Sequence, residues 1–204
     1  MLADNIRRDR NRASIVMWSV ANETPITEPR NAFLYQLVDD VRGLDDSRLV
    51  TAALLTDRKG AVMGLNDPLA DKLDVLSANT YNGWYSDDAL DSLPNIAWKT
   101  TDKPMVLSEF GADALAGFSD PVLMRKFSED FQKKYYEKTL EMARKIPSLR
   151  GMSPWLLKDF RSPRRQHPVY QQGWNRKGLV SPTGRRKAAF WVLQGFYKEK
   201  EAGK

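Results

Sequence analysis

Five short apolar runs, separated by longer amphipathic stretches, limit what this sequence can fold into more than any other feature. The runs are rich in Val, Ile, Leu or aromatic residues and lack clean polar alternation. Such runs are typical of parallel strands that are buried on both faces, with helices in the connections. The pattern therefore predicts an α/β fold with a parallel sheet. The expected strands are residues 14–20, 49–55, 74–80, 104–110 and 149–157.

The connecting stretches predict helices. Residues 31–41 carry apolar side chains on one helical stripe, and residues 2–12 are amphipathic. Residues 120–145 open on an Asp-Pro pair, and residues 182–200 follow Ser181 as the expected N-cap. Residues 87–100 are a further helix candidate, interrupted by a proline. Residues 158–180 form one long expected loop, and long loops in compact domains are often functional.

The residue types exclude several kinds of chemistry. The 204 residues contain no cysteine and a single histidine, His167, so neither a disulfide framework nor a thiolate or histidine metal centre is expected. We therefore expect no cofactor and no metal, with calcium bound by carboxylates as the remaining alternative. No apolar run approaches the roughly 20 residues of a membrane span, and the first residues lack a signal peptide's apolar core. A soluble protein without a membrane partner is expected, and its compartment stays unknown.

Charge alone does not define a partner. Lys and Arg number 32 against 26 acidic residues, which gives a net charge of +6. This excess fits an anionic partner, or simply a basic, soluble surface. The basic segments IRRDRNR, RSPRR and GRRK are dispersed and come without a nucleic-acid-binding motif. We expect no nucleic-acid partner.

Two glutamates lie at the ends of apolar runs. The first run continues into Ala21, Asn22 and Glu23, and Glu109 lies near the end of the fourth run. Reactive groups in parallel α/β folds gather at the carboxyl ends of strands. A carboxylate there is costly to bury unless it is paired, so both are candidate functional residues. The alternative is that they are solvated or arginine-paired acids at the ends of strands.

Four phrases of the sequence resemble the catalytic domain of glycoside hydrolase family 2, in the same order and at similar spacing. They are IVMWSVANE, NTYNGWY, PMVLSEFGAD and WNRKGLVSPTGRRKAAFWVL, and the resemblance covers nearly the whole chain. It implies a partial (β/α)8 TIM barrel, with about strands four to eight and their helices. Residues 1–204 would then be the C-terminal portion of the catalytic domain, without the N-terminal barrel strands and β-sandwich domains.

The same resemblance implies a retaining glycosidase without a cofactor. Glu109 would be the nucleophile and Glu23 the general acid/base, in a reaction that needs two carboxyl groups about 5–5.5 Å apart. Asn22 would hold the sugar 2-hydroxyl, and Trp155 would form a sugar platform followed by a cis bond to Leu156. For the aromatic residues, packing in the core is the alternative. The other substrate-binding residues implied in this part of the chain are Asn79, Tyr81, Trp84 and Tyr85.

The sugar is indicated by a second motif. Asn175 and Lys177 resemble the Asn-x-Lys signature by which β-glucuronidases of this family bind the substrate carboxylate, and Arg164 and Arg165 on the same loop are expected to assist. The alternatives are a plain turn before the last helix and a β-galactosidase of the same family. A non-catalytic half-barrel that only self-associates or binds carbohydrate is a third interpretation, because the absent barrel strands carry part of the sugar site in this family and residues 1–204 alone are not expected to bind the sugar fully. Because a half-barrel exposes two sheet edges, a homo-oligomer through its open face is expected.

Overall fold

The computed structural model of the chain describes residues 1–99 and 101–203, and its main feature is a parallel sheet. The sheet has the order β1-β2-β5-β7-β8, and its β1–β2, β2–β5 and β7–β8 pairs are parallel. Four of the five predicted runs contain one of these strands, and the first run, residues 14–20, overlaps β1, which begins and ends later; the predicted sheet is thereby confirmed. The strands are β1 (Met17–Asn22), β2 (Leu49–Leu54), β5 (Val75–Asn79), β7 (Met105–Glu109) and β8 (Leu149–Met152).

The chain divides into two compact units, each of which we describe by itself. The first comprises Met1–Asn79, Trp98–Ser108 and Ser148–Met152, and it holds the sheet up to Ser108. The second comprises Thr80–Ala97, Glu109–Pro147 and Ser153–Lys204. No helix in the described residues is long and apolar enough to cross a bilayer.

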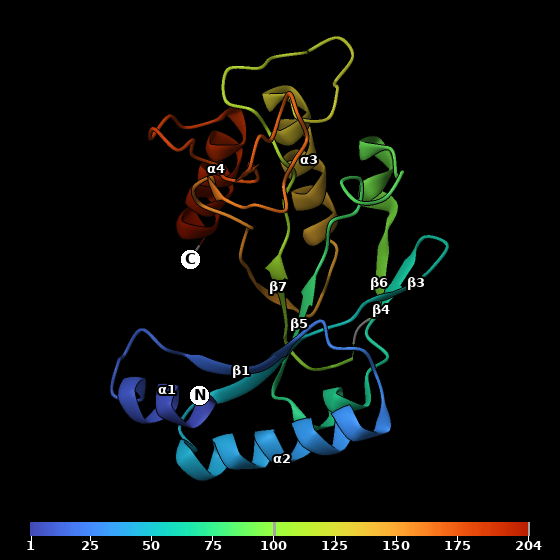
Figure 1. Cartoon of the computed structure of the whole chain (residues 1–204). Helices are drawn as coiled ribbons and strands as arrows, with labels where there is room; N and C mark the ends of the chain where they lie inside the picture. The colour runs from blue at the N-terminus through green and yellow to red at the C-terminus, as the bar shows by residue number, and fades with distance from the viewer. Residues whose placement is uncertain (100, 204) are drawn as a thin grey trace. The chain divides into compact units, whose positions relative to one another are not determined.

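Helices α1 (Leu2–Asp9) and α2 (Glu28–Leu44) belong to the first unit and lie on the same side of β1 and β2 (Figure 1). The Thr27 side chain accepts a hydrogen bond from the Arg30 amide and so caps α2. Three members of the predicted stripe, Leu34, Val38 and Val41, are the buried residues of α2, and the fourth, Leu37, is half-buried. A 3₁₀ helix, η1 (Pro68–Lys72), also lies in this unit.

Helices α3 (Glu129–Ala143) and α4 (Ala188–Ala202) belong to the second unit, and both begin later than expected. The Asp120 carboxylate accepts from the Leu123 amide and pairs with Arg125, so the Asp-Pro pair closes a turn instead of starting a helix. The cap of α3 is Ser128, whose hydroxyl accepts from the Phe131 amide. Before α4, the Ser181 hydroxyl accepts from the Arg185 amide, which closes another turn.

The prediction of a helix over residues 87–100 was wrong. The described residues form a short 3₁₀ helix, η2 (Leu90–Asn95), and then a strand, β6 (Ala97–Lys99), and Thr100 lies outside the described residues. Pro94 lacks the amide proton that a longer helix needs. Strand β6 joins a small sheet in the order β3-β4-β6. Within residues 158–180, which were expected to form one long loop, strands β9 and β10 pair antiparallel. These strands are β3 (Asp57–Lys59), β4 (Val62–Gly64), β9 (Phe160–Arg161) and β10 (Trp174–Asn175).

Candidate active site

Glu23 follows β1 with an unusual backbone. The pairing of β1 with β2 shifts register between Ser19 and Asn22, and the Glu23 amide then donates to the Ala53 carbonyl at 2.9 Å. The φ angle of Glu23 is 51°, in the left-handed region that side-chain-bearing residues seldom adopt. Its side chain is exposed. Non-glycine residues in this conformation concentrate at functional sites, so the local geometry agrees with a functional role for this carboxylate.

Asn22 and Asn79 come together at the ends of β1 and β5. The side-chain amide of Asn79 donates to the side-chain oxygen of Asn22 at 2.9 Å. Asn79 is buried, and its own oxygen accepts from the Ser108 hydroxyl at 2.8 Å. Asn22 is exposed. Ser108 was not among the site residues expected from the sequence, although it directly precedes Glu109.

In the second unit, Glu109 lies against Tyr81. The Tyr81 hydroxyl donates to the Glu109 carboxylate at 2.7 Å, and the neighbouring Thr80 amide donates to the Glu109 carbonyl at 2.8 Å. Burial, together with this hydrogen bond, raises the pKa of Tyr81 far above its ordinary value. Tyr81 therefore remains a proton donor to the carboxylate at any physiological pH.

The glycine of the Glu-Phe-Gly phrase permits a close backbone contact. A Cβ atom on Gly111 would lie 2.3 Å from the Trp155 carbonyl oxygen, which no side chain could tolerate. The Trp155 amide donates to the Phe110 carbonyl at 2.9 Å. The Trp155–Leu156 bond is cis, as expected. The half-exposed Trp155 ring meets Phe160 edge-on, so this tryptophan is held beside the segment that follows Glu109.

Lys177 is buried among aromatic rings. Its side chain is only 1% exposed, and its ammonium nitrogen lies 4.9, 5.4 and 5.8 Å from the ring centres of Tyr85, Trp84 and Tyr81. The Asp113 carboxylate forms an ion pair with it at 2.7 Å. Apart from this ion pair, neither the Lys177 ammonium nor this oxygen of Asp113 has a hydrogen-bond partner among the described residues. The ammonium can therefore still donate to a ligand.

Asn175 and Asp113 fix the segment around Lys177. The side-chain oxygen of the buried Asn175 accepts from the Lys177 amide at 3.1 Å. The second oxygen of Asp113 accepts from the Gln171 side chain at 2.6 Å. Asp113 was not among the site residues expected from the sequence, although it ends the phrase PMVLSEFGAD.

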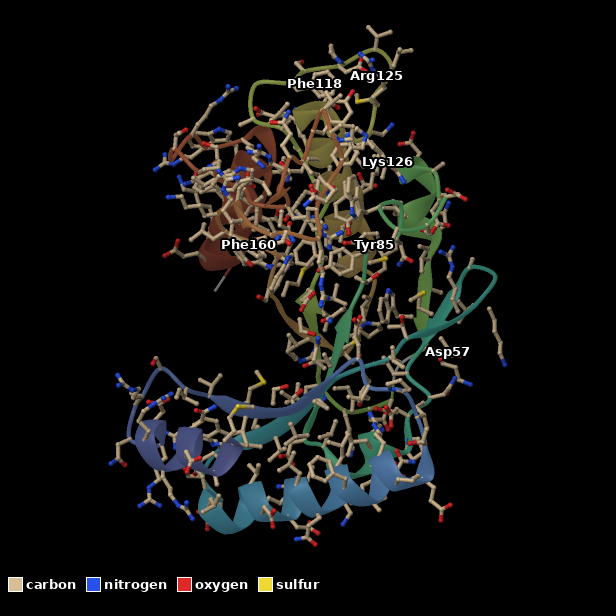
Figure 2. The ribbon with its side chains drawn as sticks, in the orientation of Figure 1. Asp57, Tyr85, Phe118, Arg125, Lys126 and Phe160 are labelled. Atoms are coloured by element: carbon tan, nitrogen blue, oxygen red, sulfur yellow. The ribbon has the colours of Figure 1, made fainter. Side chains whose placement is uncertain are left out.

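Of the two arginines considered, Arg165 reaches the aromatic residues. Its guanidinium donates to the Tyr85 hydroxyl at 2.9 Å. Tyr85 is labelled in Figure 2. Arg164 is exposed and has no hydrogen bond or ion pair among the described residues. The geometry thus favours Arg165 over Arg164 as the second cation of this site.

A network of charged side chains adjoins the ion pair of Lys177 and Asp113. The Lys187 ammonium donates to Asp159 and to the Arg176 carbonyl, each at 2.8 Å, and the Arg176 guanidinium lies 3.8 Å from Asp159. The Arg176 amide lies 3.4 Å from Asp113. Burial raises the pKa of Asp159 and lowers that of Lys187, and their mutual attraction opposes both shifts. With these groups and Lys177 ionised, three cations face two carboxylates, so the network carries one excess positive charge.

Comparison with known proteins assigns the chain to a family. The model of the glycosyl hydrolases family 2, TIM barrel domain, matches residues 1–198. The chain belongs to this family. The β-glucuronidase of the dog, Canis lupus familiaris, is 33% identical over 97% of the chain and 30% of that protein. The β-glucuronidase of Paenibacillus borealis is 31% identical over 98% of the chain and 34% of that protein.

A solved structure of this glycosyl hydrolase family agrees with the fold. The β-D-glucuronidase of Dictyoglomus thermophilum matches with a TM-score of 0.79 and 26% identity, over 97% of the chain and 34% of that structure. The five-stranded sheet and its helices are thus part of a family 2 TIM barrel. The chain spans about a third of the length of these relatives.

Within this family 2 chain, the candidate residues form one group in each unit. Asn22, Glu23 and Asn79 belong to the first unit. The residues of the group in the second unit are Tyr81, Trp84, Tyr85, Glu109, Trp155, Asn175 and Lys177.

Among the described residues, no group of three or more His, Asp or Glu side chains could hold a metal ion.

Proposed function

We propose that this chain carries the catalytic carboxylates and the uronate-binding residues of a retaining β-glucuronidase. The observation that carries the proposal is the buried Lys177 ammonium, which packs against Tyr81, the same tyrosine that donates to Glu109. A buried cation with free donors suits a sugar carboxylate, and the carboxylate of Glu109 suits attack on the sugar. The relatives that are named β-glucuronidases support the same substrate.

The proposed reaction is a double displacement. The Glu109 carboxylate attacks the anomeric carbon while Glu23 gives its proton to the departing glycosidic oxygen, and a glycosyl ester forms on Glu109. Water then attacks the same carbon, Glu23 takes a proton from that water, and Glu109 is released. Tyr81 holds the nucleophile by donating to one of its oxygens. Because Tyr81 keeps its proton, it stays a hydrogen-bond donor to the nucleophile and does not itself attack the sugar.

Charge supplies the selectivity for an acidic sugar. The network of Lys177, Lys187, Arg176, Asp113 and Asp159 has one excess positive charge, and one uronate carboxylate would neutralise it. A neutral galactoside leaves that charge uncompensated. The amide of Asn175 and the guanidinium of Arg165 are the further donors in this unit.

The proposal is tested by hydrolysis of 4-nitrophenyl β-D-glucuronide and of the matching β-D-galactoside. The chain is expected to prefer the glucuronide, and Glu109→Gln, which removes the nucleophile but keeps the shape, is expected to abolish turnover. Galactoside hydrolysis at the higher rate, or glucuronide hydrolysis that survives Glu109→Gln, would contradict the proposed function.

We also propose that this portion of the barrel self-associates. Strands β1 and β8 lie at the two edges of the sheet, so one side of each backbone has no neighbouring strand among the described residues. Val16, next to β1, is 64% exposed. Unpaired edges and exposed apolar side chains favour pairing with another copy.

A further inference from the structure

Three polar side chains form a relay across the carboxyl ends of the strands in the first unit. The Ser108 hydroxyl donates to the Asn79 oxygen at 2.8 Å, and the Asn79 amide donates to the Asn22 oxygen at 2.9 Å. These residues belong to β7, β5 and β1, and β2 lies between β5 and β1. The residue of β2 that pairs with Asn22 is Ala53, whose methyl group is short. The amide of Asn79 therefore reaches Asn22 past β2.

The relay has a direction. Each asparagine uses its oxygen to accept from the preceding member, so the free group at the end is the side-chain NH₂ of Asn22. Asn22 is exposed, and its NH₂ donates to no other group among the described residues. Asn79 is 5% exposed and has a partner for its oxygen and for its nitrogen, so its amide cannot rotate without losing both hydrogen bonds.

We propose that Ser108 and Asn79 are positioning residues, which hold Asn22 so that its NH₂ group faces the substrate. The inference rests on the proposed function, in which the Asn22 amide donates to the 2-hydroxyl of the sugar. Asn79 then acts through Asn22 rather than by touching the sugar. Ser108 acts one step further from the sugar, through the hydrogen bond that its hydroxyl donates to Asn79.

The relay can be tested without turnover. In the NMR spectrum of the full chain, the side-chain NH₂ protons of Asn79 are expected to exchange slowly with solvent. Ser108→Ala is expected to speed that exchange about tenfold, because the buried oxygen of Asn79 loses its partner and the amide can turn. Ser77→Ala is the matched control, since Ser77 is a buried serine of β5 whose hydroxyl pairs with Thr51 at 2.7 Å. Equal exchange rates of the Asn79 side-chain protons in the unmodified chain, in Ser108→Ala and in Ser77→Ala would overturn the relay.

The effect on substrate is tested with an aryl β-D-glucuronide and its 2-deoxy counterpart. Ser108→Ala is expected to lower kcat/KM about tenfold for the 2-hydroxy substrate and to leave the 2-deoxy substrate unchanged, since only the former uses Asn22. The ratio of kcat/KM for the 2-hydroxy substrate to kcat/KM for the 2-deoxy substrate is therefore expected to fall. Ser108→Thr keeps the hydroxyl and is expected to restore this ratio. Ser77→Ala is expected to keep the ratio of the unmodified chain, which separates positioning from a general loss of stability.

The two failures can be told apart. An equal loss on both substrates, or a ratio that Ser108→Ala does not change, would overturn the positioning role while leaving the proposed function intact. A chain that hydrolyses neither glycoside would contradict the proposed function, and the exchange rates of Asn79 would then decide the relay alone.

Discussion

At the scale of single residues, the proposed preference for an acidic sugar depends on the burial of Lys177. The three aromatic rings around its ammonium offer π faces but no strong acceptor, and Asp113 supplies the carboxylate at 2.7 Å. An ammonium has three donors, so a second carboxylate can bind to it. In water the same lysine would gain much less from an ion pair, because the solvent screens the charges.

Lys177→Gln is expected to lower kcat/KM for an aryl β-glucuronide about 100-fold, since a hydrogen bond to a charged group is lost in a buried site. The rate with the matching neutral β-glucoside is expected to stay the same. Lys134→Gln serves as the control, because Lys134 pairs with Asp91 at 2.7 Å in a pair exposed at the surface. An equal loss on both substrates would refute the assignment of Lys177 to the carboxylate.

The buried pair also affects folding. Asp113→Asn leaves the Lys177 charge uncompensated and is expected to lower the free energy of unfolding by about 3–5 kcal/mol. The double variant Asp113→Asn/Lys177→Met removes both charges and is expected to regain most of that stability. Urea unfolding measures the free energy of unfolding of the single and of the double variant. If the double variant is no more stable than the single one, the ion pair is not what Asp113 contributes.

At the scale of elements, Asp45 links the end of α2 to β1. Its carboxylate accepts from the Ser47 hydroxyl at 2.5 Å, from the Trp18 indole at 2.9 Å and from Arg48. The hydrogen bonds from Ser47 and Trp18, with Arg48 adding to them, hold the pKa of Asp45 well below its usual range. The folded state therefore favours the ionised carboxylate.

This linkage predicts acid sensitivity. A carboxyl group with a lowered pKa in the folded state stabilises it fully above the unfolded value of about 4, and this stabilisation is lost as the pH falls further. Asp45→Asn is expected to flatten the decline in the urea midpoint between about pH 4 and pH 2. The exposed neighbour variant Asp46→Asn is the control. A decline as steep in Asp45→Asn as in the unmodified chain would contradict the prediction.

The elements also show what the sequence could predict. The five strands were predictable because a strand buried on both faces must be apolar along its length. The starts of α3 and α4 were not, because Asp120 and Ser181 satisfy turn amides as readily as helix amides. The likeness of four phrases to a family pointed to Glu109 and Tyr81, whereas Asp113 and Ser108 became visible only through their tertiary partners.

At the scale of the whole molecule, the open edges of the sheet predict concentration-dependent association. Sedimentation velocity is expected to show dimers or larger species that increase with protein concentration. Val16→Lys, next to β1, is expected to weaken association, because a charge opposes edge-to-edge pairing. Val122→Lys, at a residue 85% exposed in the second unit, is the control. A monomer at every concentration would contradict self-association.

Covalent trapping asks whether Glu109 forms a covalent bond with a uronic acid sugar. The chain would be incubated with 2-deoxy-2-fluoro-β-D-glucuronyl fluoride, digested and analysed by peptide mass spectrometry. We expect a 2-fluoroglucuronyl group on the peptide that contains Glu109, and no label on the same peptide from Glu109→Gln. Label on Glu23 instead, or no label on either glutamate, would refute the role of Glu109 as the nucleophile.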